Sequence, residues 1–542
     1  MKTKTMRVTL LATLALLTLA LLLMLSPMPV FAATCVWTGA VNTDWATTGN
    51  WSNCQGDGDA PPAAGDTVTI PNVTNKPIIA SAVSVAGIVI DTGASLTIGS
   101  GGSLTLSGNL VNNGELKYST GAGGVTFDGT TTLSGSGIFT FRSITINAGK
   151  TLNAGSTDIT LDGTFSVSGT FNGDSGTVTF ALAAVSSATV GGSGTTNFNH
   201  LTISASGKTL NVSSNRTISI AGNFSKTAGS FGCGGGTCTV RFTGSSASTI
   251  TTFGNHPFNI TIDSGKTVNT NSSFNASGNW TNDGTFTANA GTITFNGSST
   301  QTIGGSGATT FNNLTINNSA GVTLNNNATV TGTLTLTSGD LNTGSHTLTL
   351  SSNATVTGTG DVVGNVRRAH AFNTGTNYAF NNANTLINFS SITNGASPSV
   401  VINLSKSAPA GLTTAVPRSY TITPTNISSY DATLRLGYLD SETGGMTEAN
   451  LRAWRHNGTR WVLQPGGVDT GSNYVYASNV TAFSNWAITD NGAPTAVTLS
   501  SFDARADAPS ALPLVGLGAL AVIVLGGVLW RGRTKDERRT NE

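Results

Sequence analysis

Two carboxylates are the first residues whose type and spacing could support catalysis. Glycoside hydrolysis uses a pair of carboxyl groups, one as acid and one as base or nucleophile. In the central part of this 542-residue chain the acidic residues are thinly spread, and only Asp158 and Asp162 are close in sequence. Ile159 and Leu161 alternate with polar neighbours as in a strand, which would turn both carboxylates to one side. They are the candidate catalytic pair, and the alternative is a solvated pair at a strand edge.

A second acidic group could hold a metal ion. Asp57, Asp59 and Asp66 offer the oxygen ligands that Ca²⁺ prefers. Pro61 breaks the spacing of an EF-hand loop, however, and Asp and Gly also favour ordinary turns. A plain turn is therefore the competing interpretation. No cofactor is predicted, and the five dispersed histidines suggest no catalytic triad.

The four cysteines form two pairs that are close in sequence, Cys35 with Cys54 and Cys233 with Cys238. Neither pair has a histidine nearby, which disfavours a zinc site. In an oxidising compartment such pairs are typical of disulfides. Two local disulfides are predicted.

Charge excludes one class of function. Charged residues make up 9% of the chain and the formal net charge is +1. Nucleic-acid binding draws on a field of positive charge, so that function is discarded. Regularly placed Val, Ile, Leu and Phe indicate a folded body rather than a disordered linker.

The elements that must position these residues repeat along the chain. A phrase that begins with phenylalanine and continues into an alternating strand recurs with spacings of 57, 60 and 53 residues, at Phe141, Phe198, Phe258 and Phe311. A second short motif recurs with a similar period, at Val125, Val178, Val240 and Ile293. Two phrases that share one period indicate a structural repeat.

Each repeat reads as several short strands. Apolar residues alternate with Thr, Ser or Asn for a few positions before Gly, Asn or Ser intervenes. We expect a solenoid with coils of roughly 20 to 26 residues, two or three to a repeat, whose apolar side chains stack about 4.8 Å apart. Residues 68–361 would then make roughly 13 coils, on the order of 60 to 70 Å long.

The opening of the chain resembles that of many bacterial secreted proteins with right-handed parallel β-helices. The shared phrases include Trp37-Thr38-Gly39, Gly49-Asn50-Trp51 and Asp66-Thr67-Val68-Thr69-Ile70-Pro71, and the coils look similar as well. The resemblance implies that fold and says little about chemistry. Residues 33–67 would form an N-terminal cap.

Three tryptophans in this cap allow two interpretations. Trp37, Trp45 and Trp51 could form a platform on which sugars stack, or they could cover the first coil. The exposed strands at an uncovered solenoid end can pair with other chains and cause aggregation, and a cap over the first coil prevents this. The cover is the preferred interpretation.

The repeated phrases end near Val362, where Arg, Tyr and Trp become more common. Residues 362–489 read as successive strands with one apolar face, which predicts an antiparallel β-sandwich. Phrases beginning at Tyr420 and Phe483 are similar to a module that often follows such repeats in the same proteins. Residues 490–511 would be a linker.

Both ends of the chain predict export and anchoring. Residues 1–32 have the order of a secretory signal, with an uncleaved anchor as the alternative. Residues 512–530 are uncharged and long enough to cross a bilayer as one helix, and the basic tail 531–542 favours the cytoplasmic side. The segment 512–516 also resembles a degenerate sortase sorting signal, but Val515 stands where that family has Thr. A plain membrane anchor is therefore preferred.

Two functions follow for an all-β protein of this design. The first is a structural or adhesive protein at the cell surface, whose outward Thr, Ser and Asn rows contact glycans or other surface proteins. The second is an anchored carbohydrate-active enzyme, a polysaccharide lyase or hydrolase, that uses a groove on the β-helix. Fold analogy does not establish function, and the sparse carboxylates favour the first. The ligand and the oligomeric state are not predicted.

Overall fold

The computed structural model describes residues 32–54, 60–251, 253, 255–256, 258–412 and 414–490. Contacts divide the chain into two units, and all described residues belong to the first, Met1–Thr495. Within them, no helix is both long and apolar enough to cross a bilayer. The predicted signal up to residue 31, almost all of the linker, the membrane segment 512–530 and the basic tail lie outside the described residues.

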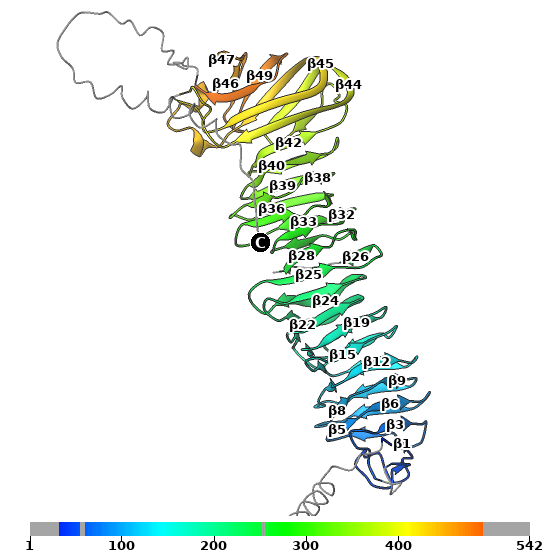
Figure 1. Ribbon diagram of the computed structural model, residues 1–542. Coiled ribbons are helices and arrows are strands. Elements are labelled where there is room, and N and C mark those ends of the chain that lie inside the picture. The colour runs from blue at the N-terminus through cyan, green and yellow to red at the C-terminus, as the bar shows by residue number, and fades with distance from the viewer. Residues whose placement is uncertain are drawn as a thin grey trace, which may run out of the picture. The chain divides into compact units, whose positions relative to one another are not determined.

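The first unit contains an all-β solenoid of right-handed type with about 14 turns (Figure 1), which confirms the predicted parallel β-helix. Each turn has three short strands, and strands of successive turns pair in parallel to give three faces.

The strands of face 1 are β4 (Ile78–Ile79), β7 (Ser95–Ile98), β10 (Glu115–Tyr118), β13 (Ile138–Phe141), β16 (Ile159–Leu161), β19 (Thr177–Phe180), the first parts of β22 (His200–Val212) and β24 (Phe224–Cys233), β26 (Ser248–Thr251), β29 (Thr267–Thr270), β32 (Thr285–Ala288), β35 (Ala308–Phe311), β38 (Ala328–Val330), and the last parts of β40 (Leu341–Leu350) and β42 (Val362–Arg368). Those of face 2 are β5 (Ala82–Val85), β8 (Ser103–Leu106), β11 (Val125–Phe127), β14 (Ile144–Ile146), β17 (Phe165–Val167), β20 (Ser187–Gly191), the last parts of β22 and β24, β27 (Asn255–His256), β30 (Phe274–Ala276), β33 (Thr292–Phe295), β36 (Asn313–Asn317), β39 (Thr333–Ser338) and β41 (Thr355–Gly358). Those of face 3 are β1 (Thr34–Trp37), β3 (Thr67–Ile70), β6 (Gly87–Ile90), β9 (Leu110–Asn112), β12 (Thr130–Ser134), β15 (Thr151–Asn153), β18 (Thr170–Asn172), β21 (Thr195–Phe198), β23 (Thr217–Ile220), β25 (Cys238–Phe242), β28 (Phe258–Ile262), β31 (Trp280–Asn282), β34 (Gln301–Gly304), β37 (Val322–Leu324), and the first parts of β40 and β42.

The core is built from stacked inward side chains. On face 1 one column runs through eight successive turns, and all of its members are buried: Leu96, Leu116, Phe139, Ile159, Val178, Leu201, Phe224 and Ile250. Alternation explains this column, because neighbouring residues of a strand point to opposite sides. Each side chain covers the one below it, so the core is continuous although no single turn could bury it alone.

The sequence repeat does not contain a whole number of turns. Its second phrase lies on face 2 in β11, on face 1 in β19, on face 3 in β25 and on face 2 again in β33. Successive copies are eight strand segments apart, because β22 and β24 each bend across two faces. Since three segments make a turn, one repeat makes 2⅔ turns.

The N-terminal residues close the first turn. β1 pairs in parallel with β3, and β2 (Trp51–Ser52) pairs antiparallel with β1. The Cys35–Cys54 disulfide ties this cap together, as predicted.

At the other end the pairing direction reverses. β42 pairs in parallel with β40 and antiparallel with β44 (Leu386–Ser405), so solenoid and antiparallel region share this strand. β44 pairs along its length with β45 (Ser419–Gly437). The remaining elements are β43 (Asn377–Ala379), β46 (Arg452–His456), β47 (Trp461–Leu463), β48 (Gly466–Asp469), β49 (Tyr474–Val480), β50 (Asn485–Thr489) and two 3₁₀ turns, η1 (Asp440–Glu442) and η2 (Glu448–Asn450).

Candidate functional site

Outward side chains form polar rows on all three faces of the solenoid. The face 1 row contains Thr140, Thr160, Thr179, Thr202, Ser225 and Thr251. The face 2 row contains Ser84, Thr105, Thr126, Thr145 and Ser166. The face 3 row contains Thr132, Asn153, Asn172, Asn197, Ser219, Arg241, Thr261 and Thr281. Neighbours in a row are about 4.8 Å apart, so each face presents hydroxyl groups at a regular interval, and face 3 also presents amide groups.

Part of the face 3 row is held in place by its own hydrogen bonds. Nδ2 of Asn172 donates to Oδ1 of Asn153 over 2.8 Å, and Nδ2 of Asn197 donates to Oδ1 of Asn172 over 3.4 Å. Such amide ladders order the side chains before any ligand arrives.

The two candidate catalytic carboxylates lie at opposite ends of β16. Asp158 is exposed, and its Oδ1 accepts the Thr177 N–H over 2.8 Å. Asp162 is buried at the corner after the strand, where both of its carboxylate oxygens lie 2.9 Å from the Ala184 nitrogen. Four extended steps separate the two Cα atoms by roughly 13 Å. Their pairing in catalysis stays a prediction.

The surroundings of Asp162 are polar. Tyr118 donates a hydrogen bond from its hydroxyl to Asp162, and burial together with that bond raises the pKa of Tyr118. Nη1 of Arg142 donates to the Asp162 carbonyl over 3.0 Å. These contacts join three successive turns at one corner, so they brace the solenoid.

The predicted calcium ligands are only partly described. Asp57 and Asp59 lie outside the described residues. Asp66 is buried, with Oδ1 accepting the Ala33 N–H over 2.9 Å and Oδ2 accepting the Ala63 N–H over 2.8 Å. Among described residues no cluster of three or more His, Cys, Asp or Glu side chains is arranged to hold a metal ion. Calcium binding at Asp57, Asp59 and Asp66 is not tested.

The three cap tryptophans are inside the protein. Trp37, Trp45 and Trp51 are at most 2% exposed, and Trp51 packs edge-on against both others with ring centroids 5.0 and 4.6 Å apart. A sugar platform needs an exposed ring face, so these rings serve as the core of the cap.

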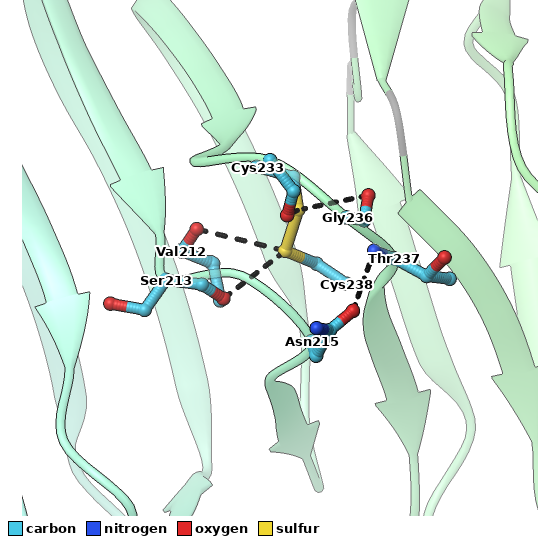
Figure 2. The surroundings of a disulfide bond; sticks show 8 residues. Val212, Ser213, Asn215, Cys233, Gly236, Thr237 and Cys238 are labelled. Atoms are coloured by element: carbon cyan, nitrogen blue, oxygen red, sulfur yellow. Dashed lines mark hydrogen bonds between the residues drawn. A yellow bond between two sulfur atoms is a disulfide. The ribbon is translucent and has the colours of Figure 1, made fainter.

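The second predicted disulfide closes the turn between β24 and β25. Figure 2 shows the Cys233–Cys238 bridge beside the turn of the coil below. The sulfur of Cys238 lies 3.3 Å from the Ser213 carbonyl oxygen, and Oδ1 of Asn215 accepts the Thr237 N–H over 3.0 Å. The bridged turn therefore supports the Ser213–Asn215 turn.

An ion cluster lies where the solenoid meets the antiparallel region. Arg418, 1% exposed, donates from Nη1 and Nη2 to the two carboxylate oxygens of Asp361 over 2.9 and 2.7 Å. Nε of Arg418 donates to Glu442 over 2.5 Å, and Nζ of Lys406 lies 2.8 Å from Asp361 and 2.7 Å from Asp340. Sequence reasoning missed this cluster because its members are far apart in the chain.

Burial and charge oppose each other at Asp361. Burial acts to raise the pKa of the carboxyl group, but the hydrogen bonds and charge of Arg418, together with hydrogen bonds from Lys406 and Asn382, outweigh it. The pKa of Asp361 is therefore held below its ordinary value. A hollow of about 230 Å³ adjoins Asp361 and Arg418. Because every charge in the cluster faces at least one charge of opposite sign, the cluster serves as a structural joint.

A second hollow, of about 550 Å³, opens on face 3 and is lined by Arg216 and Arg241. Sequence reasoning did not single out either residue. A signal was present, since residues 68–361 contain only three arginines, Arg142, Arg216 and Arg241.

Comparison with known proteins yields one similarity. Residues 36–145, the cap and the first turns, match a family described as "Domain of unknown function (DUF8693)". The match covers less than half of the chain. No curated protein and no solved structure matches the chain. Function must therefore be argued from the geometry.

Proposed function

We propose that the protein is a structural or adhesive component of the cell surface, whose solenoid presents polar rows to glycans or neighbouring proteins. One observation carries the proposal: three faces display rows of hydroxyl groups at one-turn intervals, joined on face 3 by asparagine amides, with little charge. Such groups can donate and accept hydrogen bonds with the hydroxyls of an extended polysaccharide.

The sequence at the two ends supports the location. In this proposal residues 1–32 direct export, residues 512–530 cross the membrane as a helix, and residues 362–489 close into a β-sandwich. The body then faces outward. Many weak contacts along a row would act together, so binding depends on multivalent display.

The test is binding and turnover by the full-length protein on neutral and acidic glycans presented at high density. Three triple variants remove hydroxyls while keeping β-branched side chains. T140V/T160V/T179V lies on face 1 and T105V/T126V/T145V on face 2. T151V/T170V/T195V lies on face 3, where these threonines form a second outward row beside Asn153, Asn172 and Asn197. Each variant serves as the control for the other two.

We expect one triple variant to lose most of the binding and the other two to keep it. Binding that no triple variant alters, or no binding at all, would contradict the proposal. Product release that depends on Asp158, tested with D158A, would instead favour the carbohydrate-active enzyme.

A further inference from the structure

Three corners of the solenoid share a Gly-Ser-Gly turn whose first glycine, Gly135, Gly192 or Gly305, has a positive φ, and two of these corners are filled in the same way. At the Gly135 and Gly305 corners a buried asparagine of the turn below fills the space. Nδ2 of Asn112 donates to the Ile138 carbonyl over 2.8 Å. Nδ2 of Asn282 donates to the Ala308 carbonyl over 2.7 Å and to the Thr309 hydroxyl over 2.9 Å.

The third corner, at Gly192, is filled by an arginine. The residue below it is Val167, which cannot donate from its side chain. Arg216 reaches in from the turn above, and it donates from Nη1 to the Gly192 carbonyl and from Nη2 to the Thr196 hydroxyl. Thr196 follows Gly192 as Thr309 follows Gly305. A neutral amide therefore suffices at the other two corners, and the charge of Arg216 exceeds what the corner requires.

Comparison of the internal repeats also indicates that the fold does not require a charged residue at the position of Arg216. In three repeats a Gly-Lys-Thr turn leads into one strand segment, and a second strand follows it: β16, β23 or β30. The residue two positions before the first inward apolar residue of that second strand can be compared between the repeats. It is Thr157, Arg216 and Ser272. A neutral residue thus occupies this place in the other two copies, so the fold tolerates one.

The charge of Arg216 has no partner of opposite sign in the described part of the chain. Arg216 is 7% exposed, and its Nε is buried without a hydrogen-bond acceptor. Burial lowers the pKa of its guanidinium. An uncompensated buried charge is costly, and an anion in the adjoining hollow would relieve that cost.

The hollow suits a sugar that carries an acid group. It is about 550 Å³ in volume, and no acidic residue is among those that line it. Ser193, Thr195, Thr217 and Ser219 supply hydroxyls around Arg216. Arg241 also lines the hollow, and its Nε donates to Oδ1 of Asp263 over 2.7 Å. The hollow interrupts the face 3 row at Ser219 and Arg241, so a glycan lying along that row would pass over it.

The turn that carries Arg216 is also braced. The Cys233–Cys238 bridge lies against Ser213, and Asn215 is tied to Thr237 (Figure 2). Arg216 follows directly in the chain, so the guanidinium is held in position before a ligand arrives.

We propose that the hollow around Arg216 binds the carboxylate of a uronic acid residue in an acidic glycan. The planar guanidinium matches a carboxylate, and the surrounding hydroxyls match the sugar ring. This inference rests on the proposed glycan-binding function and specifies its ligand.

Arg368 shows the structural alternative. It is also buried, and among the described residues no carboxylate pairs with it. Its Nε, Nη1 and Nη2 all donate to backbone carbonyls, of Ala379, Ser351 and Ala354 among others. If Arg216 only fills its corner as Arg368 does, a neutral residue there would alter stability and leave ligand preference unchanged.

The experiment is calorimetric titration of the full-length protein with three probes: a galacturonic acid hexamer, the same hexamer with its carboxyl groups reduced to alcohols, and sodium sulfate. The variants are R216T, which introduces the residue type found at Thr157, and R460T, which removes an equal charge at an exposed residue of the antiparallel region. S219D adds an opposing charge to the hollow at an outward position, and so keeps the test valid if R216T does not fold.

We expect the wild-type protein to bind the acidic hexamer at least about tenfold more tightly than the reduced hexamer. R216T and S219D should abolish that preference, and R460T should keep it. Equal binding of both hexamers, or an unchanged preference in R216T and S219D, would overturn the inference while leaving the proposed function standing. Sulfate that binds as tightly as the hexamer would also overturn it, since the site would then be a small-anion site. Failure to bind any glycan would count against the proposed function itself.

Discussion

At the scale of single residues, the molecule concentrates its buried charge at the joint around Asp361 and Arg418. Asp361 comes from the end of the solenoid and Arg418 from the residue before β45, and both side chains are at most 2% exposed. A buried pair of this kind is costly to break, because the remaining partner is left charged and desolvated. The joint therefore couples the last turn to the antiparallel region.

Replacing Arg418 by methionine should lower the free energy of unfolding by about 3 to 5 kcal/mol. Denaturant titration measures this, and the double variant D361L/R418M should recover much of the loss. The exposed pair Lys117–Glu115 is the matched control; K117M should change stability by less than about 1 kcal/mol. Equal losses in R418M and K117M would contradict the buried joint.

The same joint should weaken in acid. The pKa of Asp361 in the folded chain lies below its value in the unfolded chain, about 4, so the unfolded chain takes up the proton first. Stability from Asp361 is then complete above about pH 5 and falls as the pH drops through the folded-state pKa. The unfolding free energies of wild type and D361N, measured from pH 7 to pH 3, should differ by a constant amount at the upper end and converge at the lower end. A difference that grows in acid would disprove this assignment.

At the scale of elements, the backbone conformation at the corners of the solenoid determines where nearby side chains lie. Gly192 has a φ of +89°, and a Cβ there would lie 2.2 Å from the Val167 carbonyl oxygen. G192A should therefore cost about 1 to 3 kcal/mol and displace the Arg216 corner. Thermal unfolding and hydrogen exchange at β21 and β23 would show the change. G207A is the control, since Gly207 has a similar positive φ but nothing lies within 4 Å of the position that its Cβ would take; its smaller effect would isolate the clash from the backbone strain.

Much of the solenoid could be predicted from sequence, because alternation of apolar and polar residues is a local signal. The column through Leu116, Phe139 and Ile159 follows from it directly. Corners are harder. Alternation placed Asp158 and Asp162 on one side, but the chain turns after Leu161 and buries Asp162. Sequence reasoning also left the number of turns per repeat open, because β22 and β24 change face within one strand.

The candidate hollow depends on contacts between successive turns of the solenoid, which the sequence alone does not reveal. Arg216 fills a corner of the turn below, and its contacts Gly192 and Thr196 are 24 and 20 residues earlier. Its role becomes visible only once the Asn112 and Asn282 corners can be compared with it. The arginine itself was an available signal, since so few charges occur in the solenoid.

At the scale of the whole described unit, the repeat of eight strand segments predicts different stabilities for two deletion variants of similar length. Removing residues 160–224 joins Ile159 to Ser225 and takes out three full turns, so each later strand keeps its face. Removing residues 178–239 takes out one sequence repeat but shifts every later strand by one face. We expect the first deletion to unfold at the higher temperature, because its inward columns stay matched. A higher transition temperature for the second would mean that sequence identity matters more than face register.

The reversal of direction at β42 has a consequence for assembly. The last strand of face 1 is bonded to β40 on one side and to the antiparallel β44 on the other. At the opposite end, β2 and the cap lie against β1. A second molecule therefore finds no open parallel edge at β42 on which to continue the stack, and end-to-end growth into cross-β fibrils is blocked there by the fold itself.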